Sequence, residues 1–358
     1  MSTAETRVRA FHPLQVAAVR HLCEDAVAVT FAVPDHLTDE FRFRPGQFLT
    51  LRRTVDGVEE RRSYSICAPQ GDAPGVGVRE VTEGLFSRWL VHELAPGDTV
   101  QVQAPSGGFT ADPALGGDHL LIGAGSGITP LLSIAASLLA NPASSVTLLY
   151  GNRRSGTVMF ADELADLKDQ YGARFSLIHV LSREPRDVEL FSGRLDAERI
   201  GAIIGALIAL DTVDHAWLCG PLGMVQDATT VLSAHGMPTD RIHRELFFVG
   251  DTPPPPELHR EPGVTGPSSK VTITLDGRSS TADLPCDRTI LDAAERVRSD
   301  LPFACKGGVC GTCRAKITDG TAEMRRNYAL EDAEVAAGFV LTCQTYPTSE
   351  TLVVDFDA

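Results

Sequence analysis

The sequence predicts a multidomain protein with an antiparallel β-barrel domain, an α/β domain built on a doubly wound parallel sheet, and a small α+β domain. The length of 358 residues suits two or three domains. Near His119 the hydrophobic pattern changes from short strands alone to strands that alternate with helices. The proline-rich stretch 251–269 has the composition of a linker. We therefore expect domains over residues 1–113, 114–250 and 270–358.

Short stretches rich in Val, Thr, Phe and Tyr fill the first domain, and Gly, Pro or Asp bounds each of them. Strands are expected at residues 27–33, 47–53, 61–67, 76–81 and 98–105. Such a run of short strands is typical of an antiparallel barrel or sandwich.

The other two domains mix strands with helices. In the second domain, strands are expected at 119–125, 146–151, 175–182 and 215–220, and helical segments at 128–140, 159–171, 196–210 and 224–236. This alternation predicts a parallel, doubly wound sheet. In the third domain, strands are expected at 270–277, 279–285, 314–320 and 351–357, and a helix at 289–298.

Charge and cysteine content argue against several classes of function. Lys+Arg 32 and Asp+Glu 47 give a formal net charge of −15, which repels phosphate backbones and anionic lipid surfaces. We therefore expect neither nucleic acid nor a membrane as a partner. Residues 1–15 lack the apolar segment of a secretory signal, and the apolar run 202–210 is too short to span a bilayer. With Cys 8, this predicts a cytoplasmic protein whose clustered thiols bind metal rather than form disulfides.

Four cysteines form the pattern Cys305-x4-Cys310-x2-Cys313-x29-Cys343. This spacing is typical of a plant-type [2Fe–2S] cluster, whose two irons take four thiolates. A zinc site is the alternative, but such sites are usually built from paired C-x2-C elements, and only one is present here.

Glycines between these cysteines suit a loop that wraps a cluster. Gly307, Gly308 and Gly311 allow positive φ and therefore tight turns. Such turns also let backbone N–H groups point at the sulfur atoms, which tunes the potential of a cluster.

These motifs carry a resemblance to known families. Residues 270–358 resemble a plant-type ferredoxin domain, which implies a β-grasp fold. The preceding residues resemble the ferredoxin–NADP⁺ reductase superfamily through the R-x-Y-S element at 62–65 and the glycine-rich turn at 123–130. Together they resemble oxygenase reductases that carry ferredoxin at the C-terminus. The stretch 324–344 is similar to the reductase subunits of bacterial phenylacetyl-CoA epoxidases.

The resemblance implies an FAD site at Arg62, Tyr64 and Ser65; the residues alone do not separate FAD from FMN. An arginine fork can hold a pyrophosphate, and a tyrosine face can stack on a ring system. The Ser65 hydroxyl is expected near flavin N5, which makes it a candidate catalytic residue. Alone, R-x-Y-S would fit an ordinary strand, but the flanking segments 43–47 and 84–87 support the flavin assignment.

Further flavin contacts are expected where a short helix begins after the barrel strand VGVREV. Gly84, Phe86 and Ser87 open this helix, whose first N–H groups would receive phosphate oxygens. In the family the preceding strand often carries a lysine where this sequence has Arg79. We count Arg79 and Val81, both on that strand, among the expected cofactor-binding residues.

A glycine-rich turn is expected to bind the nicotinamide nucleotide. Gly123, Gly125, Gly127, Thr129 and Pro130 follow a buried strand and open a helix. Glycines let the backbone approach a pyrophosphate, and the helix N-terminus supplies N–H donors. The spacing is G-x-G-x-G, as in the superfamily, and differs from the G-x-G-x-x-G dinucleotide fingerprint.

Polar side chains follow two of the expected parallel strands at their carboxyl ends, where open α/β sheets bind ligands. Asn152 and Arg153 follow one strand, and Ser182 and Arg183 follow the next. The Ser–Arg pair resembles the 2′-phosphate contacts of NADPH-using relatives, so NADPH is favoured over NADH. The alternative is a solvated loop with ordinary arginines.

The last expected site residues come late in the reductase part. Cys219 and Gly220 match a C-G-P element whose thiol, in the superfamily, lies beside the nicotinamide. Glu245 and Phe247 resemble the segment near the flavin ring, where an aromatic side chain can shield the flavin. Phe248 is an equal candidate for shielding, and either phenylalanine fits a core position as well. Cys219 and Glu245 join the candidate catalytic residues.

The expected cofactors together predict an electron-transfer reductase. A nicotinamide gives up two electrons at once, a [2Fe–2S] centre accepts one, and a flavin can take two and release them singly. The expected order is therefore NADPH, FAD, [2Fe–2S] cluster and an external acceptor. No Glu-x-x-His pair for a di-iron site occurs in the chain, so substrate oxidation belongs to a partner.

The resemblance implies that the partner is a multisubunit di-iron oxygenase, most specifically a phenylacetyl-CoA epoxidase. A reductase for a Rieske-type oxygenase, such as a steroid hydroxylase, is the alternative. An iron–sulfur sensor without turnover is a third, from another class of function.

Overall fold

The computed structural model describes residues 10–248 and 268–358, apart from positions 56, 83, 299 and 331. The described residues form two compact units, one within Phe11–Gly250 and one within Asp251–Ala358. The expected proline-rich linker lies outside the described residues, except for residues 268 and 269, which already belong to the first strand of the second unit.

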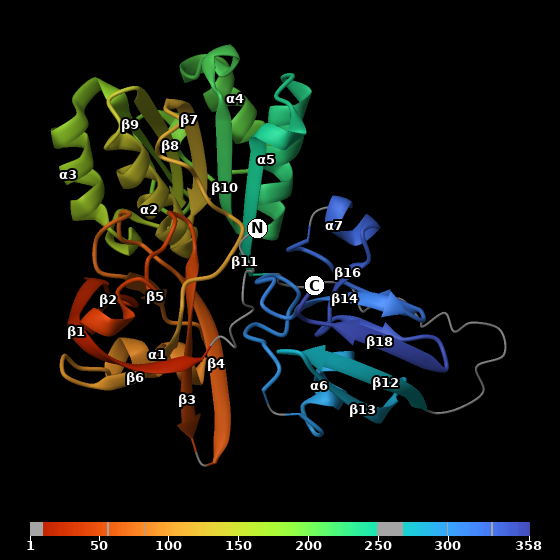
Figure 1. Ribbon diagram of the computed structural model, residues 1–358. Helices are drawn as coiled ribbons and strands as arrows, with labels where there is room; N and C mark the ends of the chain where they lie inside the picture. The colour runs from red at the N-terminus through yellow and green to blue at the C-terminus, as the bar shows by residue number, and fades with distance from the viewer. Residues whose placement is uncertain (1–9, 56, 83, 249–267, 299, 331) are drawn as a thin grey trace. The chain divides into compact units, whose positions relative to one another are not determined.

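Six antiparallel strands form the barrel of the first unit (Figure 1). They are β1 (Phe11–Cys23), β2 (Ala26–Ala32), β3 (Phe48–Val55), β4 (Val58–Ser65), β5 (Gly75–Arg79) and β6 (Thr99–Gln103), in the order β4-β3-β6-β1-β2-β5. A bridge between Ile66 and Val76 brings the two edges together, and helix α1 (Leu85–His92) follows β5. The sequence did not predict β1, because only Leu14 and Val16 of its thirteen residues are fully buried.

The second half of this unit is a parallel sheet in the order β11-β10-β7-β8-β9. Its elements are β7 (Gly117–Ala124), α2 (Ile128–Leu139), β8 (Ser144–Asn152), α3 (Ala161–Tyr171), β9 (Phe175–Leu181), α4 (Ala197–Leu207), β10 (His215–Pro221), α5 (Leu222–Ala234) and β11 (Ile242–Phe248). Helices α2 and α3 cover one face, and α4 and α5 cover the other (Figure 1). The strand order reverses between β7 and β10, the place where such sheets bind ligands.

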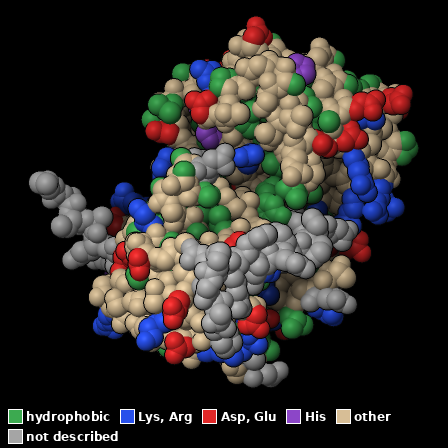
Figure 2. Space-filling model, turned by 90° about the vertical axis from the view of Figure 1, so that its right-hand side faces the viewer, with side chains coloured by type: hydrophobic (Ala, Val, Ile, Leu, Met, Phe, Trp, Pro, Cys, Tyr) green, Lys and Arg blue, Asp and Glu red, His purple; other side chains and the backbone are tan. Residues whose placement is uncertain are grey.

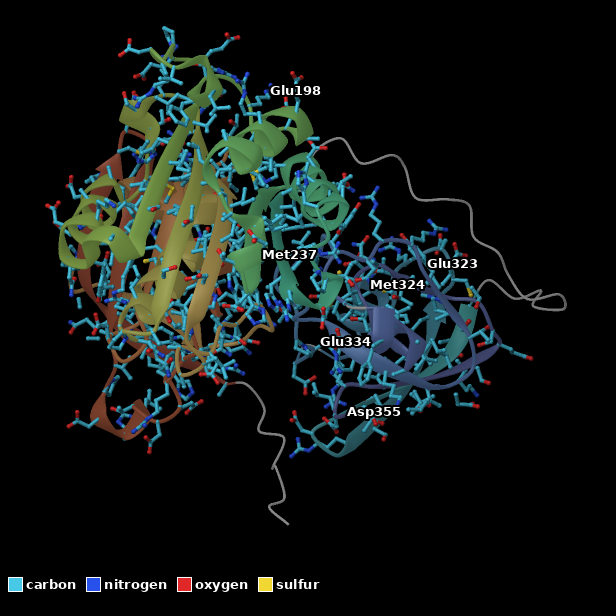
Figure 3. The ribbon with its side chains drawn as sticks, turned by 90° about the horizontal axis from the view of Figure 1, so that it is seen from above. Glu198, Met237, Glu323, Met324, Glu334 and Asp355 are labelled. Carbon is cyan, nitrogen blue, oxygen red and sulfur yellow. The ribbon has the colours of Figure 1, made fainter. Side chains whose placement is uncertain are left out.

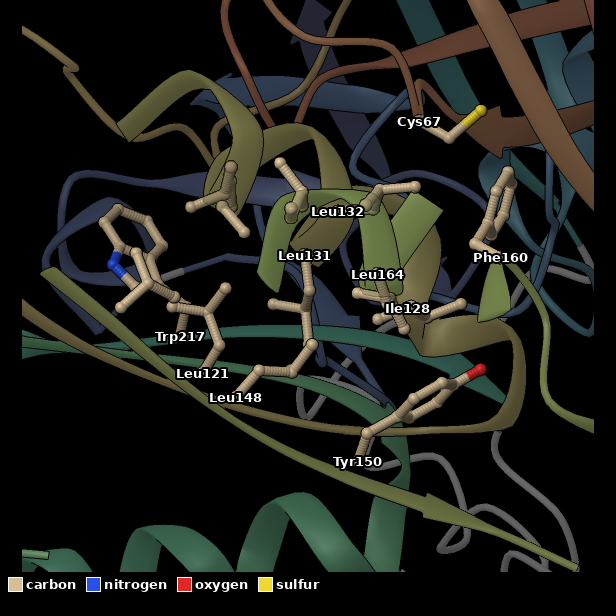
Figure 4. Packing of buried hydrophobic residues seen from close by; sticks show 14 of the residues in the cluster. Cys67, Leu121, Ile128, Leu131, Leu132, Leu148, Tyr150, Phe160, Leu164 and Trp217 are labelled. Atoms are coloured by element: carbon tan, nitrogen blue, oxygen red, sulfur yellow. The ribbon is translucent and has the colours of Figure 1, made fainter. Parts of the chain in front are cut away.

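A shared hydrophobic core joins the barrel to the parallel sheet. Cys67, from the barrel, belongs to the same buried cluster as Leu121 of β7, Leu131 of α2 and Trp217 of β10 (Figure 4). Gly77 on β5 makes a close approach possible, since a Cβ there would lie 2.5 Å from the Thr129 side chain. The barrel therefore packs directly against the start of α2.

The second unit is a β-grasp fold. It contains β12 (Ser268–Leu275), β13 (Arg278–Pro285), α6 (Ile290–Ala294), β14 (Arg314–Asp319), β15 (Ala322–Met324), α7 (Asp332–Ala336), β16 (Phe339–Leu341), β17 (Thr345–Pro347) and β18 (Thr351–Asp355). The main sheet has the order β13-β12-β18-β14-β16, and β15 pairs with β17. The sulfur of Met324, at the end of β15, accepts a hydrogen bond from the Leu341 N–H at 3.3 Å (Figure 3).

Helix α6 ends at Ala294, so the helix expected up to residue 298 is wrong in its second half. Beyond this end the chain continues as a turn, in which the Arg298 N–H still donates to the Ala294 carbonyl at 2.8 Å. The buried Arg298 guanidinium donates to the carbonyls of Leu275 and Arg278 at 2.8 Å and pairs with Asp300 at 2.7 Å. These bonds tie the turn to the β12–β13 hairpin.

On the face shown in Figure 2, acidic and basic side chains are interspersed. Among the helices in the described part of the chain, none is long and apolar enough to cross a bilayer.

Three histidines lie together where β7, β10 and β11 begin. His215 Nδ1 and His243 Nε2 are 3.1 Å apart, and His119 stacks on His215 with ring centroids 6.0 Å apart. Trp217 stacks on His243 at 4.0 Å. Burial, followed by the neighbouring His215, lowers the pKa of His243 to about 4.

We expect this cluster to make the first unit less stable in acid. The folded-state pKa of His243 lies below its ordinary value of 6.5, so the unfolded chain takes up the proton first as the pH falls from about 6.5 to about 4. Allowing for solvent screening, the free energy of unfolding should fall by about 0.5–1 kcal/mol between pH 6.5 and 5.5. His243→Phe should flatten the dependence of melting temperature on pH over this range, whereas the same change at the exposed His36 should not. Parallel curves for all three proteins would contradict the prediction.

Candidate functional site

Three residues far apart in sequence meet between the barrel and the parallel sheet. Ser65 at the end of β4 donates its hydroxyl to Glu245 Oε2 at 3.2 Å. Cys219 Sγ lies 4.0 Å from the same oxygen, because Cys219 and Glu245 are paired neighbours on β10 and β11. The three residues expected to be catalytic therefore converge on one carboxyl group.

The environment of this carboxyl group favours its protonated form. Glu245 is part-exposed as a residue, but its carboxyl group is withdrawn from solvent, and this burial raises its pKa to about 8. The hydrogen bond from Ser65 acts in the opposite direction and is the weaker effect. Burial and then the adjacent Glu245 raise the pKa of Cys219 well above its ordinary value. Near pH 7 the site thus holds a protonated carboxyl and a thiol.

The other expected flavin residues, Arg62 and Tyr64, precede Ser65 on β4. Arg62 is exposed, and its Nη1 donates to the Arg61 carbonyl at 2.7 Å. The Tyr64 ring lies 6.2 Å from the Phe86 ring at the start of α1, and burial raises the Tyr64 pKa. A cationic fork and an aromatic face are thus available on one strand, with Ser65 next to them.

A tight turn leads from β5 into α1. The Ser87 hydroxyl accepts from the Val81 N–H at 3.0 Å and donates to the Gly84 carbonyl at 3.1 Å. A Cβ on Gly84 would lie only 2.7 Å from that hydroxyl oxygen. At this turn, the Val81 side chain is 57% exposed and that of Leu85 is 64% exposed. Exposed apolar side chains beside the N-terminus of a helix suit a ligand with an apolar ring and a phosphate.

The glycine-rich turn lies at the switch point of the parallel sheet. Gly125 adopts φ +56, and its carbonyl accepts the Tyr150 hydroxyl at 2.9 Å. A Cβ on Gly127 would collide with the backbone of Cys219. Thr129 is buried and its hydroxyl donates to the Ser126 carbonyl at 3.0 Å. These glycines therefore let the turn pack against β10, next to the carboxyl group at Glu245.

Asp25, on the turn between β1 and β2, was not predicted from the sequence. One of its carboxylate oxygens lies 3.2 Å from Arg79 Nε, and the other lies 3.1 Å from Arg153 Nη2. Arg79 also donates to the Thr157 carbonyl, and its Nη1 would lie 3.3 Å from a Cβ on Gly125. Asp25 thus links the arginine of the barrel to the arginine that follows β8. No motif surrounds Asp25, so no sequence signal could have identified it.

The loops after β8 and β9 run side by side. The Ser182 N–H donates to the Asn152 carbonyl at 2.9 Å, and the Arg183 N–H donates to the Arg153 carbonyl at 2.8 Å. Arg153 is half-exposed and Arg183 is exposed. The backbone and hydroxyl of Ser155 donate to the Glu184 carboxylate and lower its pKa. The expected 2′-phosphate residues are therefore neighbours, with one carboxylate beside them.

Phe247 is partly buried and packs against the shared core. The side chain of Phe248 lies outside the described residues. Gly220 adopts φ +154, a backbone conformation that residues with a Cβ rarely take.

In the second unit, the four cysteines of the expected cluster lie together as two pairs. Cys305 and Cys310 interact through their sulfur atoms, and so do Cys313 and Cys343. The contact with Cys310, supported by N–H groups of the loop, lowers the pKa of Cys305 to about 5. None of these four cysteines is in a disulfide.

This arrangement fits two irons rather than one. Two thiolates on each of two irons, completed by bridging sulfides, need two adjacent cysteine pairs, and the four cysteines lie as two such pairs. The donor set is all thiolate, which iron–sulfur clusters prefer.

The loop that carries the first three of these cysteines uses positive φ at Lys306 (φ +50), Gly308 (φ +80) and Gly311 (φ +67). Gly307, expected to supply one such turn, is not among these residues; its N–H instead points at Cys305 Sγ at 3.3 Å. The left-handed backbone conformation expected at Gly307 is thus adopted by the preceding residue, Lys306.

Three protein-family models match the chain in order. An oxidoreductase FAD-binding domain matches residues 13–110, an oxidoreductase NAD-binding domain matches 121–230, and a 2Fe-2S iron-sulfur cluster binding domain matches 273–348. The expected cofactors FAD, a nicotinamide nucleotide and a [2Fe–2S] cluster are thereby confirmed.

Curated relatives match over nearly the whole chain. The chain is 45% identical to a subunit of the 1,2-phenylacetyl-CoA epoxidase of Escherichia coli K12, over 97% of this chain and 98% of the relative. It is 35% identical to the ferredoxin reductase component of 3-ketosteroid-9-alpha-monooxygenase from Rhodococcus rhodochrous, over 96% of each chain.

Solved structures agree on the fold. Phthalate dioxygenase reductase matches with a TM-score of 0.60 and 22% identity, over 97% of this chain and 98% of that one. A type IV self-sufficient cytochrome P450 monooxygenase matches with a TM-score of 0.67 and 20% identity; 96% of this chain is covered, which spans 41% of that protein. By its three domain matches and its full-length relatives, the chain belongs to the family of FAD- and [2Fe–2S]-dependent reductase components of oxygenases.

Proposed function

We propose that this reductase takes electrons from NADPH and delivers them, through FAD and its [2Fe–2S] cluster, to a di-iron oxygenase that epoxidises phenylacetyl-CoA. The observation that carries the redox part is the meeting of Ser65, Cys219 and Glu245 at the switch point of the parallel sheet. The acceptor is proposed from the 45% identical relative, which is named as a subunit of 1,2-phenylacetyl-CoA epoxidase.

Arg62, Tyr64 and Ser65 are proposed to hold FAD, together with the turn formed by Gly84, Phe86 and Ser87 and the exposed Val81. The support is the exposed Arg62 guanidinium, the aromatic pair at Tyr64 and the N-terminus of the eight-residue helix α1. When bound, the flavin accepts a hydride and releases its electrons one at a time. Ser65 keeps its hydroxyl proton directed at Glu245 Oε2, which leaves its lone pairs free to accept a hydrogen bond.

The nicotinamide nucleotide is proposed to lie over Gly123, Gly125 and Gly127, with Thr129 and Pro130 opening α2 beneath its pyrophosphate. Arg79 reaches the same turn from the barrel, so we assign its charge to the nucleotide pyrophosphate. Cys219 and Gly220 then face the nicotinamide end, beside Glu245 and Phe247. The cluster ligands are Cys305, Cys310, Cys313 and Cys343.

We propose NADPH over NADH, with Arg153, Ser182 and Arg183 around the 2′-phosphate. The side chain of Asn152, expected from the sequence to join them, is buried and is not part of this proposal. Arg183→Ala should raise KM for NADPH about 10–150-fold, the effect of losing a charged hydrogen bond, and should change KM for NADH much less. Steady-state kinetics with both nucleotides measure the difference. Arg241→Ala, exposed at the amino end of β11, is the control and should alter neither value. Equal effects of Arg183→Ala on both nucleotides would exclude the 2′-phosphate role.

The identity of the acceptor has its own test. The purified reductase should support NADPH-dependent epoxidation of phenylacetyl-CoA by the di-iron oxygenase subunits. The second candidate is a Rieske-type or steroid oxygenase, favoured by the 35% identical relative. If the reductase supports product formation by that oxygenase and not by the di-iron oxygenase, the first proposal is wrong and the second takes its place. A cytoplasmic location is proposed because thiolate ligands need a reducing compartment.

A further inference from the structure

The side chain of Gln344 lies against the cluster loop. Its Nε2 donates to the carbonyls of Lys306 and Cys343, each at 2.8 Å. The same nitrogen lies 3.7 Å from Cys343 Sγ, within the range of an N–H···S hydrogen bond. Two hydrogens thus serve three acceptors, one of which is a proposed cluster ligand.

The backbone of Gln344 is fixed on both sides. Its N–H donates to the Leu341 carbonyl at 2.8 Å, and its carbonyl accepts the Arg325 N–H at 2.9 Å. The backbone from which the Gln344 side chain extends is therefore held by the chain around β16 and β15, while the amide itself is held by its bonds to the carbonyls of Lys306 and Cys343.

The loop that Gln344 contacts is under backbone strain. Lys306 adopts φ +50, a conformation that residues with a Cβ seldom take. Two contacts stabilise it from opposite sides. The Lys306 ammonium pairs with Asp292 at 3.0 Å and Glu295 at 2.5 Å, while its carbonyl receives the Gln344 amide.

Gln344 also packs over the neighbouring glycine. A Cβ on Gly308 would lie 3.0 Å from Gln344 Cγ, so the glutamine stem occupies the space above this residue. Gln344 therefore touches the loop at two residues and the fourth cysteine at its sulfur.

We propose that Gln344 is a positioning residue that raises the reduction potential of the [2Fe–2S] cluster, an inference that rests on the four-cysteine ligand set proposed above. Reduction adds one electron to the cluster, and part of the added negative charge resides on the ligand sulfurs. An N–H donor at Cys343 Sγ stabilises the reduced form more than the oxidised form. By holding the Lys306 carbonyl, the same amide keeps the loop N–H groups aimed at Cys305.

Gln344→Met in the full-length holoprotein tests this role, since methionine keeps a stem of similar length without an N–H donor. Iron content and visible spectrum should be retained. The equilibrium constant for cluster reduction should fall about five- to tenfold, a shift of about 40–60 mV to lower potential at 59 mV per decade. EPR-monitored redox titration measures the shift. Resonance Raman spectra in H₂O and D₂O should show a smaller isotope shift of the Fe–S(Cys) modes in the variant.

Two further variants separate tuning from loop support. Gln344→Glu keeps the shape, removes the donor and adds a negative charge, so its potential should lie lower still. Asp292→Asn weakens the opposite support of Lys306 without touching Gln344, and should not lower the potential.

The outcomes are distinguishable. An unchanged potential and unchanged isotope shift in Gln344→Met with an intact cluster would overturn the proposal, as would loss of iron from both Gln344 variants, which would leave Gln344 a loop support only. A wild-type chain that cannot assemble a [2Fe–2S] cluster would instead overturn the ligand set itself, and the proposal with it.

Discussion

Cys310→Ala should abolish the [2Fe–2S] cluster while leaving reduction of the flavin by NADPH in place. The substitution removes one thiolate of the pair formed with Cys305 and leaves one iron short of a ligand. Residues that only orient metal ligands typically change metal affinity about 10–100-fold when they are replaced, and loss of a direct ligand should reduce it further. The visible absorption of the cluster, bound iron and transfer to a one-electron acceptor such as cytochrome c should all fall to background.

The flavin half supplies the internal comparison. Ser65, Cys219 and Glu245 belong to the first unit, so stopped-flow bleaching of the flavin by NADPH should keep its wild-type rate. Cys286→Ala is the matched control, because Cys286 is a buried cysteine of the second unit that contacts the Ser269 hydroxyl at 3.3 Å. An intact cluster spectrum in Cys310→Ala, or an equal loss in Cys286→Ala, would refute the ligand assignment.

The parts of the molecule that were predictable are those encoded locally. The cysteine spacing from 305 to 313 and the glycine turn from 123 to 127 each specify a loop within a few residues, and short-range sterics decide its shape. Gly125 shows this, since it adopts φ +56 within the turn, a conformation that residues with a Cβ seldom take. The alternation of strands and helices similarly predicted the parallel sheet.

Features that depend on distant residues were not predictable in the same way. Strand β1 buries little, so its pairing with β2 and β6, and not its own pattern, makes it a strand. Helix α6 ends at Ala294, and the buried Arg298 beyond it binds carbonyls of a hairpin about twenty residues earlier, partners that the local pattern does not show. Asp25 gains its importance only when folding brings Arg79 and Arg153 to it.

Glu245→Gln should stabilise the protein and slow flavin reduction at the same time. The folded-state pKa of Glu245, about 8, lies above its ordinary value of 4.5. The contribution of this carboxyl to stability is therefore full below about pH 4.5 and is lost as the pH rises to about 8. At pH 7 this lowers the free energy of unfolding by about 3 kcal/mol. A neutral glutamine avoids this effect but forms poorer hydrogen bonds, so Glu245→Gln should recover about 1–2 kcal/mol.

The pH profile distinguishes this cause from a general packing effect. Urea unfolding of both proteins between pH 5 and 9 should give free energies that separate steadily up to about pH 8 and then run parallel. Glu24→Gln, which removes an exposed carboxylate, should show no such trend. A difference between wild type and Glu245→Gln that is constant with pH would contradict the raised pKa.

The functional cost follows from the Ser65 hydroxyl. In the wild type the Ser65 proton is held by Glu245 Oε2 at 3.2 Å, and the protonated carboxyl carries a single hydrogen of its own. A glutamine carries two hydrogens on its nitrogen, and an amide nitrogen placed at the Oε2 position donates to Ser65 and turns the Ser65 proton elsewhere. Loss of one preorganised polar contact at a reacting centre costs about 100-fold in rate. Stopped-flow reduction of the flavin by NADPH should slow by this order, while the midpoint potential of the cluster, which lies in the other unit, stays unchanged. A stabilised variant with an unaltered rate would place Glu245 outside the reaction and leave its raised pKa a matter of burial alone.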